Sequence, residues 1–403
     1  MQLANSVALW WAALGGCIGL VLGLLMGLIA RRGRLDRLSS QADRLAERVR
    51  LDHGESMDLE LKLKAAETRI EGLEAEIATA RAAGSIAESP QPRTIVGSEA
   101  EMWRSVPAGD LDAYAQWLAA SPTKVLTIGS LKGGVGKTTI AANLAAYFDA
   151  RLGKRVLAID LDYQGSLSVL LLQAARIPEL VSLSNELIDG SGDGRWLIGA
   201  CKPLAPLLSR TWLVPASYTL EETESRLMLR WLGGQTRDDV RYNLARVLLS
   251  KEVQDNFDIV IIDIGPRLTT GAINALVAST HLVVPTVLDR LSAETVGAFL
   301  RKVRALRNDL NHQLALVGVV GTFTSGVDRL KPHEEDALTM VRAGLAQWGE
   351  EVPIIDRHIP RRQAIAEYAG RDLAYVKDEA IAQIFDALGR EVAVRMGLDA
   401  GGR

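Results

Sequence analysis

Residues 130–139 read SLKGGVGKTT, a stretch in which lysines, glycines and hydroxyl side chains are spaced to bind phosphate. It ends like the phosphate loop G-x-x-x-x-G-K-[ST], but Leu131 stands where that pattern has its first glycine. In such a loop Lys137 would reach the β- and γ-phosphates, and the Thr138 hydroxyl would bind Mg²⁺. Lys132 is a second lysine that the standard loop does not need.

The residues on either side predict the elements that a phosphate loop requires. Val125–Ile128 is a short apolar run typical of a strand, and the run TIAANLAA from Thr139 consists of good helix formers. A strand, a glycine turn and a helix in this order direct backbone N–H groups and a helix N-terminus at the phosphates. We therefore expect ATP and Mg²⁺ as cofactors. The residues expected around the nucleotide are Gly133, Gly134, Val135, Gly136, Lys137, Thr138 and Thr139.

Two further apolar runs end in carboxylates. One is RVLAIDLD, with Asp160 and Asp162, and the other is FDIVIID, with Asp263. Near-continuous apolar runs are typical of parallel strands covered on both faces, and ligands bind at the carboxyl ends of such strands. For any one aspartate the alternative is a cap of the next turn. Together they predict an α/β P-loop NTPase with a mostly parallel, twisted sheet flanked by helices.

Six segments together resemble the ParA/MinD family of deviant Walker A ATPases, in the family's order over roughly residues 123–395. They are KGGVGKTT at 132–139, DLDYQGSLS at 160–168, LVPAS at 213–217, FDIVIIDIGP at 257–266, INALVASTHLVVPT at 273–286 and IPRRQAIAEYAG at 359–370.

The resemblance implies a catalytic set of Lys132, Lys137 and Asp162. Lys132 would be the signature lysine, which crosses an ATP-sandwiched dimer to the partner's phosphates, and Asp162 would help to position the attacking water. Phosphoryl transfer is catalysed mainly by positioning and by cations that meet the developing negative charge. A lysine supplied across an interface would therefore make turnover depend on dimerisation.

The resemblance also implies the remaining site residues. Asp160 would lie near Mg²⁺ and the phosphate-loop lysine, Asp263 would hold Mg²⁺ through water, and Thr138 completes the expected metal set. Asn274 would contribute to nucleotide binding, and Pro360-Arg361 would close over the base.

The sequence departs from the family pattern at two places. Tyr163 stands where a proline is usual, and Ile264-Gly265 replace the usual small polar residue and proline after the second acidic strand. Neither change removes a phosphate or metal ligand, so the departures concern the rate of hydrolysis and the switch movement that follows it.

The N-terminal residues predict a membrane anchor. Met1–Ala30 has no charged side chain, and Val7–Ala30 is long enough to cross about 30 Å of hydrocarbon. A cleaved signal peptide is the alternative, but a basic n-region and a small-x-small site before Arg31-Arg32 are missing. Arginines follow the segment and none precedes it, so we expect a single-pass protein of the inner membrane with its ATPase domain in the cytoplasm.

A heptad pattern follows, with Leu35 and Leu38 at its first a and d positions and an unbroken register to about residue 83. Alternating 3–4 spacing over this length predicts a coiled coil, and its charge pairs favour a parallel dimer. A coil would hold two ATPase heads at high effective concentration. The predicted division is a transmembrane helix at 1–30, a parallel coiled coil at 31–83, a linker with a short helix around Leu111–Ala120 at 84–122, and the ATPase domain at 123–398.

Composition limits the partners. The net charge of −3 and the pI of about 6.1 provide no overall field toward DNA or anionic lipid, so any such contact needs a local patch. Arginines and a lysine between Arg301 and Arg307 form one candidate DNA patch, and arginines between Arg357 and Arg371 form another; a solvated helix face is the alternative. Ile381, Ile384, Phe385 and Leu388 recur at helical spacing, as expected of a core helix.

The leading hypothesis is a membrane-anchored ATPase whose ATP-dependent head dimerisation positions or regulates a partner complex or DNA held nonspecifically. The alternative is a membrane scaffold that binds nucleotide structurally with little hydrolysis. A tyrosine-kinase-like relative is disfavoured because the chain ends REVAVRMGLDAGGR, without tyrosine, and a nitrogenase iron protein would need cluster cysteines. Trp196, Trp212 and Trp231 belong to no motif.

Overall fold

The computed structural model describes residues 99–398 apart from 179–180, 328, 350–353 and 369–370, and residues 1–98 and 399–403 are not described. The transmembrane helix predicted at 1–30, the coiled coil predicted at 31–83 and the first part of the predicted linker lie outside the described residues. These predictions remain untested by the fold. The described residues belong to one compact unit of the chain.

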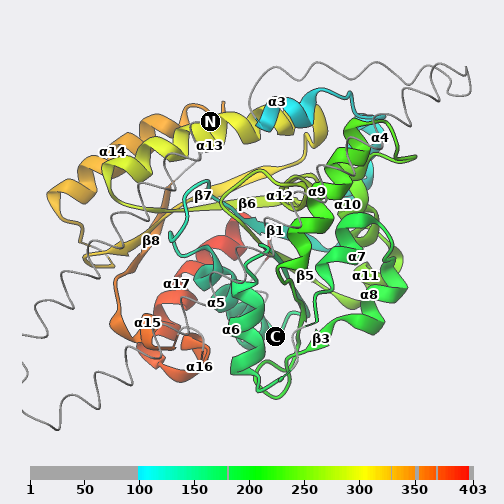
Figure 1. Ribbon diagram of the computed structural model, residues 1–403. Coiled ribbons are helices and arrows are strands. Elements are labelled where there is room, and N and C mark those ends of the chain that lie inside the picture. Colours follow the sequence, from blue (N-terminus) through cyan, green and yellow to red (C-terminus); the bar gives the residue numbers. More distant parts are fainter. Residues whose placement is uncertain (1–98, 179–180, 328, 350–353, 369–370, 399–403) are drawn as a thin grey trace, which may run out of the picture. The chain divides into compact units, whose positions relative to one another are not determined.

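An eight-stranded sheet lies at the centre of this unit, with helices on both of its faces (Figure 1). The strand order is β3-β4-β2-β5-β1-β6-β7-β8, and all neighbours are parallel except the β3–β4 pair. The strands are β1 (Lys124–Ile128), β2 (Val156–Leu161), β3 (Lys202–Pro203), β4 (Thr211–Val214), β5 (Ile259–Ile264), β6 (His281–Val287), β7 (Ala315–Thr324) and β8 (Ile354–Pro360). The predicted mostly parallel α/β sheet is confirmed.

The central strands are apolar on both faces because each face meets a separate core. In β5, Val260 and Ile262 join one core, whereas Ile259 and Ile261 join the other, and all four are fully buried. Side chains of a strand point alternately to the two faces, so a covered central strand needs apolar residues at every position.

Helices of the larger core cover one face of the sheet. They are α3 (Glu99–Arg104), α7 (Ser184–Asp189), α8 (Gly194–Ala200), α9 (Thr219–Leu232), the 3₁₀ helix η1 (Val240–Tyr242), α10 (Asn243–Leu248), α11 (Lys251–Asn256), α12 (Thr270–Ala278), α13 (Arg290–Leu310) and α14 (Pro332–Leu345). The predicted short helix is α4 (Leu111–Ala120), whose Tyr114 packs on the same core.

Helices of the second core cover the opposite face. They are α5 (Lys137–Ala150), α6 (Ser166–Ala174), α15 (Gln363–Tyr368), α16 (Ala374–Lys377) and α17 (Glu379–Arg395). The core helix expected from Ile381, Ile384, Phe385 and Leu388 is α17, and all four side chains are buried. The helical spacing of these residues therefore reflects core packing.

The strand register brings the predicted acidic residues to one edge of the sheet. Asp160 on β2 and Asp263 on β5 are directly paired by their Cα atoms, and Ile128 at the end of β1 pairs with Asp263 on the other side. The loop that leaves β1 therefore begins beside both carboxylates.

The fold corrects the predicted location of the chain. Within the described residues no helix is both long and apolar enough to cross a membrane. The longest, α13, carries Arg301, Lys302 and Arg304 on its outer side while its apolar side chains pack on the sheet, as in a helix that borders water. The predicted single-pass location in the inner membrane is contradicted by this finding.

Candidate nucleotide-binding site

The loop at residues 129–136 joins β1 to α5 and has the shape that its glycines require. Gly134 and Gly136 adopt φ angles of +70° and +84°, in the left-handed region that favours glycine. A Cβ atom on Gly133 or Gly134 would meet nothing within 4 Å, so the loop faces open space at these two positions. Gly136 is the N-cap of α5 and offers no side-chain acceptor to the first-turn N–H groups. Those groups suit an anion supplied from outside the chain.

Thr138 and Asp263 form the polar centre of the site. The Thr138 hydroxyl donates a hydrogen bond of 2.6 Å to Oδ2 of Asp263. The other carboxylate oxygen, Oδ1, is buried and has no hydrogen-bond partner among the described residues. Burial raises the pKa of Asp263 well above its usual range, and the Asp160 carboxylate raises it further. An unpaired buried oxygen of this kind is costly unless a partner from outside the chain satisfies it.

These two residues fit a magnesium ion that is mostly coordinated by phosphate and water. No cluster of three or more His, Cys, Asp or Glu side chains in the described part of the chain could hold a metal by itself. Mg²⁺ needs no such cluster, because it keeps several waters and binds through a few protein oxygens together with substrate phosphates. The Thr138 hydroxyl and the unpaired Asp263 oxygen match this requirement.

Asp160 is held by its own neighbours. Its Oδ2 accepts hydrogen bonds from the backbone N–H and the hydroxyl of Ser168, at 2.8 and 2.7 Å, and its Oδ1 accepts one from the N–H of Asp162 at 3.1 Å. The side chain is fully buried, and burial raises its pKa to about 6. Asp160 thus lies beside Asp263, and its oxygens fix the start of α6 and the turn at Asp162.

Asp162 follows β2 and is partly exposed. Its Oδ1 accepts a hydrogen bond from Gln164 N–H at 3.1 Å, which holds the carboxylate in the turn before α6. Gly265 lies directly beside it, since a Cβ atom at that position would be 3.3 Å from the Asp162 carboxyl carbon. The glycine that departs from the family pattern therefore leaves room for this carboxylate.

Lys137 is buried at the start of α5, and its Nζ donates to the backbone carbonyl of Lys132 at 3.2 Å. Burial lowers the pKa of Lys137, whereas the nearby carboxylates of Asp263 and Asp162 raise it. The lysine and both carboxylates are thus close enough to interact electrostatically, as expected of one site.

Lys132 contacts its own chain. Its Nζ donates to the Ser292 hydroxyl at 2.5 Å and lies 3.4 Å from Oδ2 of Asp289. Asp289 is the N-cap of α13 and also accepts hydrogen bonds from Ser292. These bonds and Lys132 lower the pKa of Asp289 although burial alone would raise it.

A pocket of about 850 Å³ lies beside the loop and contains the predicted base-closing residues. Gly134, Gly136 and Thr139 line it on one side, and Pro360 and Arg361 line it on the other. Its remaining lining residues are Val287, Thr322, Phe323, Ile359, Arg362, Gln363 and Ile365. The structure therefore brings both parts of the predicted nucleotide site together.

Asn274 lies elsewhere. Its amide nitrogen donates to the backbone carbonyls of Val240 and Thr270, at 3.0 and 2.9 Å, and its oxygen accepts from Leu244 N–H at 3.1 Å. The side chain is fully buried and connects α12 to η1 and α10. Asn274 is thus not among the residues that the structure gathers around the phosphate loop.

Phe323 lines the nucleotide pocket and was not predicted from the sequence. Phe323 adopts a φ of +54° at the pocket, and the guanidinium of Arg361 lies 5.7 Å from the centre of its ring. Val135 is fixed through its backbone carbonyl, which accepts a hydrogen bond of 3.0 Å from the Thr322 hydroxyl. A positive φ in an aromatic residue is uncommon and leaves no signal in the sequence.

Glu224 on α9 was not predicted from the sequence either. Its Oε1 accepts hydrogen bonds from the Thr269 hydroxyl at 2.5 Å and from Gly271 N–H at 2.6 Å, so it holds the start of α12. Burial raises its pKa to about 7, and the charges of Asp162 and Glu221 raise it further. In the sequence LEETES nothing distinguishes this glutamate from its exposed neighbours.

Comparisons with known proteins identify the family to which the chain is similar. A family model described as an AAA domain matches residues 123–316. The chromosome partitioning protein ParA of Caulobacter vibrioides is 32% identical over 281 residues, which cover 69% of this chain and 97% of that protein. The chromosome-partitioning ATPase Soj of Thermus thermophilus is 31% identical over 277 residues, covering 67% of this chain and 96% of that protein.

Among solved structures, apo McdA from Cyanothece has a TM-score of 0.55 at 22% identity, over 67% of this chain and 99% of that one. A variant of the same protein, solved as a complex with ATP, has a TM-score of 0.56 at 21% identity, over 70% and 98% of the two chains. At this level of identity the two structures support the fold.

Proposed function

Since this chain belongs to the ParA/MinD family of P-loop ATPases, we propose that it hydrolyses ATP and that ATP closes two copies of its domain into a dimer. The observation that supports ATP hydrolysis most strongly is the Thr138–Asp263 pair at the phosphate loop, with one buried carboxylate oxygen that lacks a partner among the described residues. The family members named above are partitioning proteins, so we assign this chain to ATPases that partition or position cellular cargo.

ATP and Mg²⁺ are the cofactors of the site. The uncapped N-terminus of α5 suits the phosphates, and the pocket of about 850 Å³ beside it suits the base and sugar. Thr138 and Asp263 would hold Mg²⁺, the latter through water. When bound, the ion supplies positive charge that offsets the negative charge of the phosphate oxygens.

The proposed hydrolysis depends on three side chains of the site. Lys137, buried between the loop and the carboxylates, would turn from the Lys132 carbonyl to the phosphates. Asp162 would orient the attacking water, since its carboxylate is partly exposed and fixed by the Gln164 N–H. Orienting the water and offsetting charge are the main protein contributions to phosphoryl transfer.

The proposed dimer requires Lys132 to change partners. In this structure its ammonium group contacts Ser292 and Asp289 of its own chain. To reach the phosphates of a second copy, Lys132 must leave these two side chains. The contact with Asp289 is partly exposed, so it costs little to break, and two phosphate groups would be a stronger partner for the lysine.

The second candidate is a nucleotide-binding scaffold with little hydrolysis. Tyr163 and the Ile264-Gly265 pair favour it, because both departures flank the Asp162 carboxylate.

The cargo in either case is a protein complex or DNA retained by the ATP-bound dimer. Part of the candidate DNA patch on α13 is used within the fold, since Arg304 donates to the Gln347 carbonyl and Arg307 lies 5.2 Å from the Trp348 ring centre.

Steady-state ATP turnover and sedimentation of the full chain test the proposal. Wild type with Mg-ATP should turn over and should form the closed dimer. Asp162→Ala should lose turnover and accumulate in the ATP-bound form, and Lys132→Ala should lose both turnover and ATP-driven closure. ATP binding without turnover in the wild type would favour the scaffold. If Lys132→Ala matched the wild type in both measurements, the dimer proposal would be wrong.

A further inference from the structure

The segment at residues 99–107, which we call the N-terminal segment, precedes the region matched by the family model, yet it packs tightly on the domain. Its Trp103 is completely buried, and the ring stacks on Trp231 of α9 with centroids 5.2 Å apart and planes 21° apart. Trp231 belonged to no sequence motif, and this contact explains its place in the fold.

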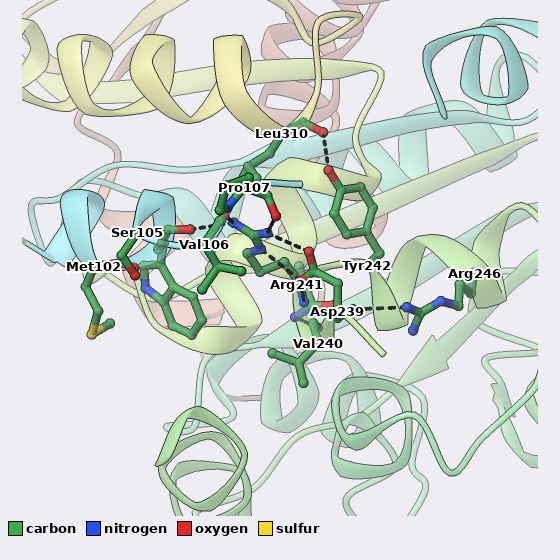
Figure 2. A network of polar contacts seen from close by, with 12 residues as sticks. Met102, Ser105, Val106, Pro107, Asp239, Val240, Arg241, Tyr242, Arg246 and Leu310 are labelled. Atoms are coloured by element: carbon green, nitrogen blue, oxygen red, sulfur yellow. Dashed lines mark hydrogen bonds and ion pairs between the residues drawn. The ribbon is translucent and has the colours of Figure 1, made fainter. Parts of the chain in front are cut away.

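A buried arginine fixes the backbone of the N-terminal segment. The Arg241 guanidinium is fully buried and donates to the carbonyls of Trp103 and Val106, at 2.7 and 2.8 Å. Figure 2 shows Arg241 between Val106 and Asp239, and the ion pair to Asp239 is 2.5 Å long. The same guanidinium lies 5.1 Å from the Trp231 ring centre. Burial of a charge is costly unless it is paired, so this arrangement holds the segment in one position.

From that position Trp103 reaches the loop that follows β5. Its indole Nε1–H donates a hydrogen bond of 2.8 Å to the backbone carbonyl of Leu268. The loop at residues 265–269 begins with Gly265, beside the Asp162 carboxylate, and ends with Thr269, the N-cap of α12. Trp103 is thus connected to the loop whose first residue lies beside Asp162.

A small pocket lies between the N-terminal segment, the turn after β2 and the loop after β5. It has a volume of about 240 Å³ and is lined by Met102 of the N-terminal segment, Tyr163 next to Asp162, and Leu268 of the loop. Glu224, which holds Thr269 and the start of α12, lines it as well. The N-terminal segment, the turn after β2 and the loop after β5 therefore surround one space.

We propose that Trp103 is a positioning residue for ATP hydrolysis, which holds the loop at 265–269 against Asp162 through its hydrogen bond to Leu268. This inference rests on the proposed function. It places control of the hydrolysis rate in a segment that lies outside the matched family domain, because movement of residues 99–107 would move the loop. ATP binding should be independent of Trp103, because no residue of the N-terminal segment lines the nucleotide pocket.

Trp103→Phe in the full chain tests the hydrogen bond, because phenylalanine keeps an aromatic ring for Trp231 and lacks the N–H donor. The matched control is Trp117→Phe on α4, where the side chain is 46% exposed. We expect kcat of Trp103→Phe to fall about three- to tenfold, with the Kd for Mg-ATP within about twofold of wild type. The Trp117→Phe control should match the wild type. A kcat for Trp103→Phe equal to or above that of the control would overturn the proposal.

Hydrogen exchange in the wild type is an independent measurement that needs no variant to fold. On addition of Mg²⁺ and a non-hydrolysable ATP analogue, amides at 265–271 and at 99–107 should change their exchange rates together. A change at 265–271 with none at 99–107 would contradict the coupling. Absence of ATP turnover in the wild type would refute the proposed function, while the exchange result would still decide whether the two segments are coupled.

Discussion

Replacing Glu224 by glutamine should remove a pH dependence of folding stability that this single carboxyl produces. Burial raises the pKa of Glu224 from 4.5 to about 7 in the folded protein. Between these values the folded state holds a proton that the unfolded state has lost, so the unfolding free energy falls as the pH rises. At about 1.4 kcal/mol for each tenfold change in proton affinity, the full effect is about 3 kcal/mol.

The neighbours of Glu224 support the direction of this effect. Asp162 and Glu221 are the carboxylates that act on it, and both disfavour its ionised form. Hydrogen bonds from Thr269 and Gly271 favour the ionised form but are outweighed by burial. The side chain is 5% exposed, so water screens these interactions little.

The assay is urea unfolding of the nucleotide-free protein between pH 5 and 8, followed by tryptophan fluorescence. The wild type should lose roughly 2.5 kcal/mol more than Glu224→Gln over this range. Glu222→Gln, an exposed position on the same helix whose charge is not among those that act on Glu224, is the control and should follow the wild type. Other buried carboxyls, such as Asp160, contribute equally to all three proteins and cancel in the difference. The argument would be refuted if the unfolding free energies of the wild type and Glu224→Gln changed with pH by the same amount.

Three further predictions concern charges at and near the site. Asp289→Asn keeps the N-cap of α13 and removes the charge facing Lys132, so ATP-driven dimerisation should rise about two- to fivefold in sedimentation experiments; an unchanged dimerisation constant would mean that the contact has no effect. Asp263→Asn should raise the Mg²⁺ concentration for half-maximal ATP turnover about 10- to 100-fold, as a magnesium titration would show. Arg241→Met should lower the unfolding free energy by roughly 3 kcal/mol in urea, whereas Arg246→Met at an exposed position should cost less than about 1 kcal/mol.

Short sequence patterns predicted three central strands and the turn that follows the first of them. The apolar runs before the loop, before Asp162 and up to Asp263 became β1, β2 and β5, and the glycines marked the turn between β1 and α5. These predictions succeeded because a covered parallel strand needs apolar residues throughout and a left-handed turn needs glycine. The order of the strands in the sheet had no such signal, since it depends on where each crossover helix packs.

Contacts between residues far apart in the chain could not be predicted from the sequence. Lys132 meets Ser292 and Asp289 in this structure, although 160 and 157 residues separate them. Trp103 and Trp231 stack on each other, and neither belongs to a motif. Asn274 showed the reverse case, because its position after the second acidic strand suggested a nucleotide contact while its amide connects α12 to η1. A match to the family's sequence pattern gives the place of a residue along the chain. The contacts of its side chain depend on how the elements pack, which the pattern does not give.

The burial of Trp103 also bears on how this protein is divided for experiments. A fragment that starts at residue 123, where the family match begins, would expose the face of Trp231 and remove the carbonyl acceptors of Arg241. An uncovered aromatic surface beside a cation that has lost its carbonyl acceptors promotes self-association and lowers solubility. The smallest fragment expected to remain dispersed in solution therefore begins before α3, at or ahead of Glu99.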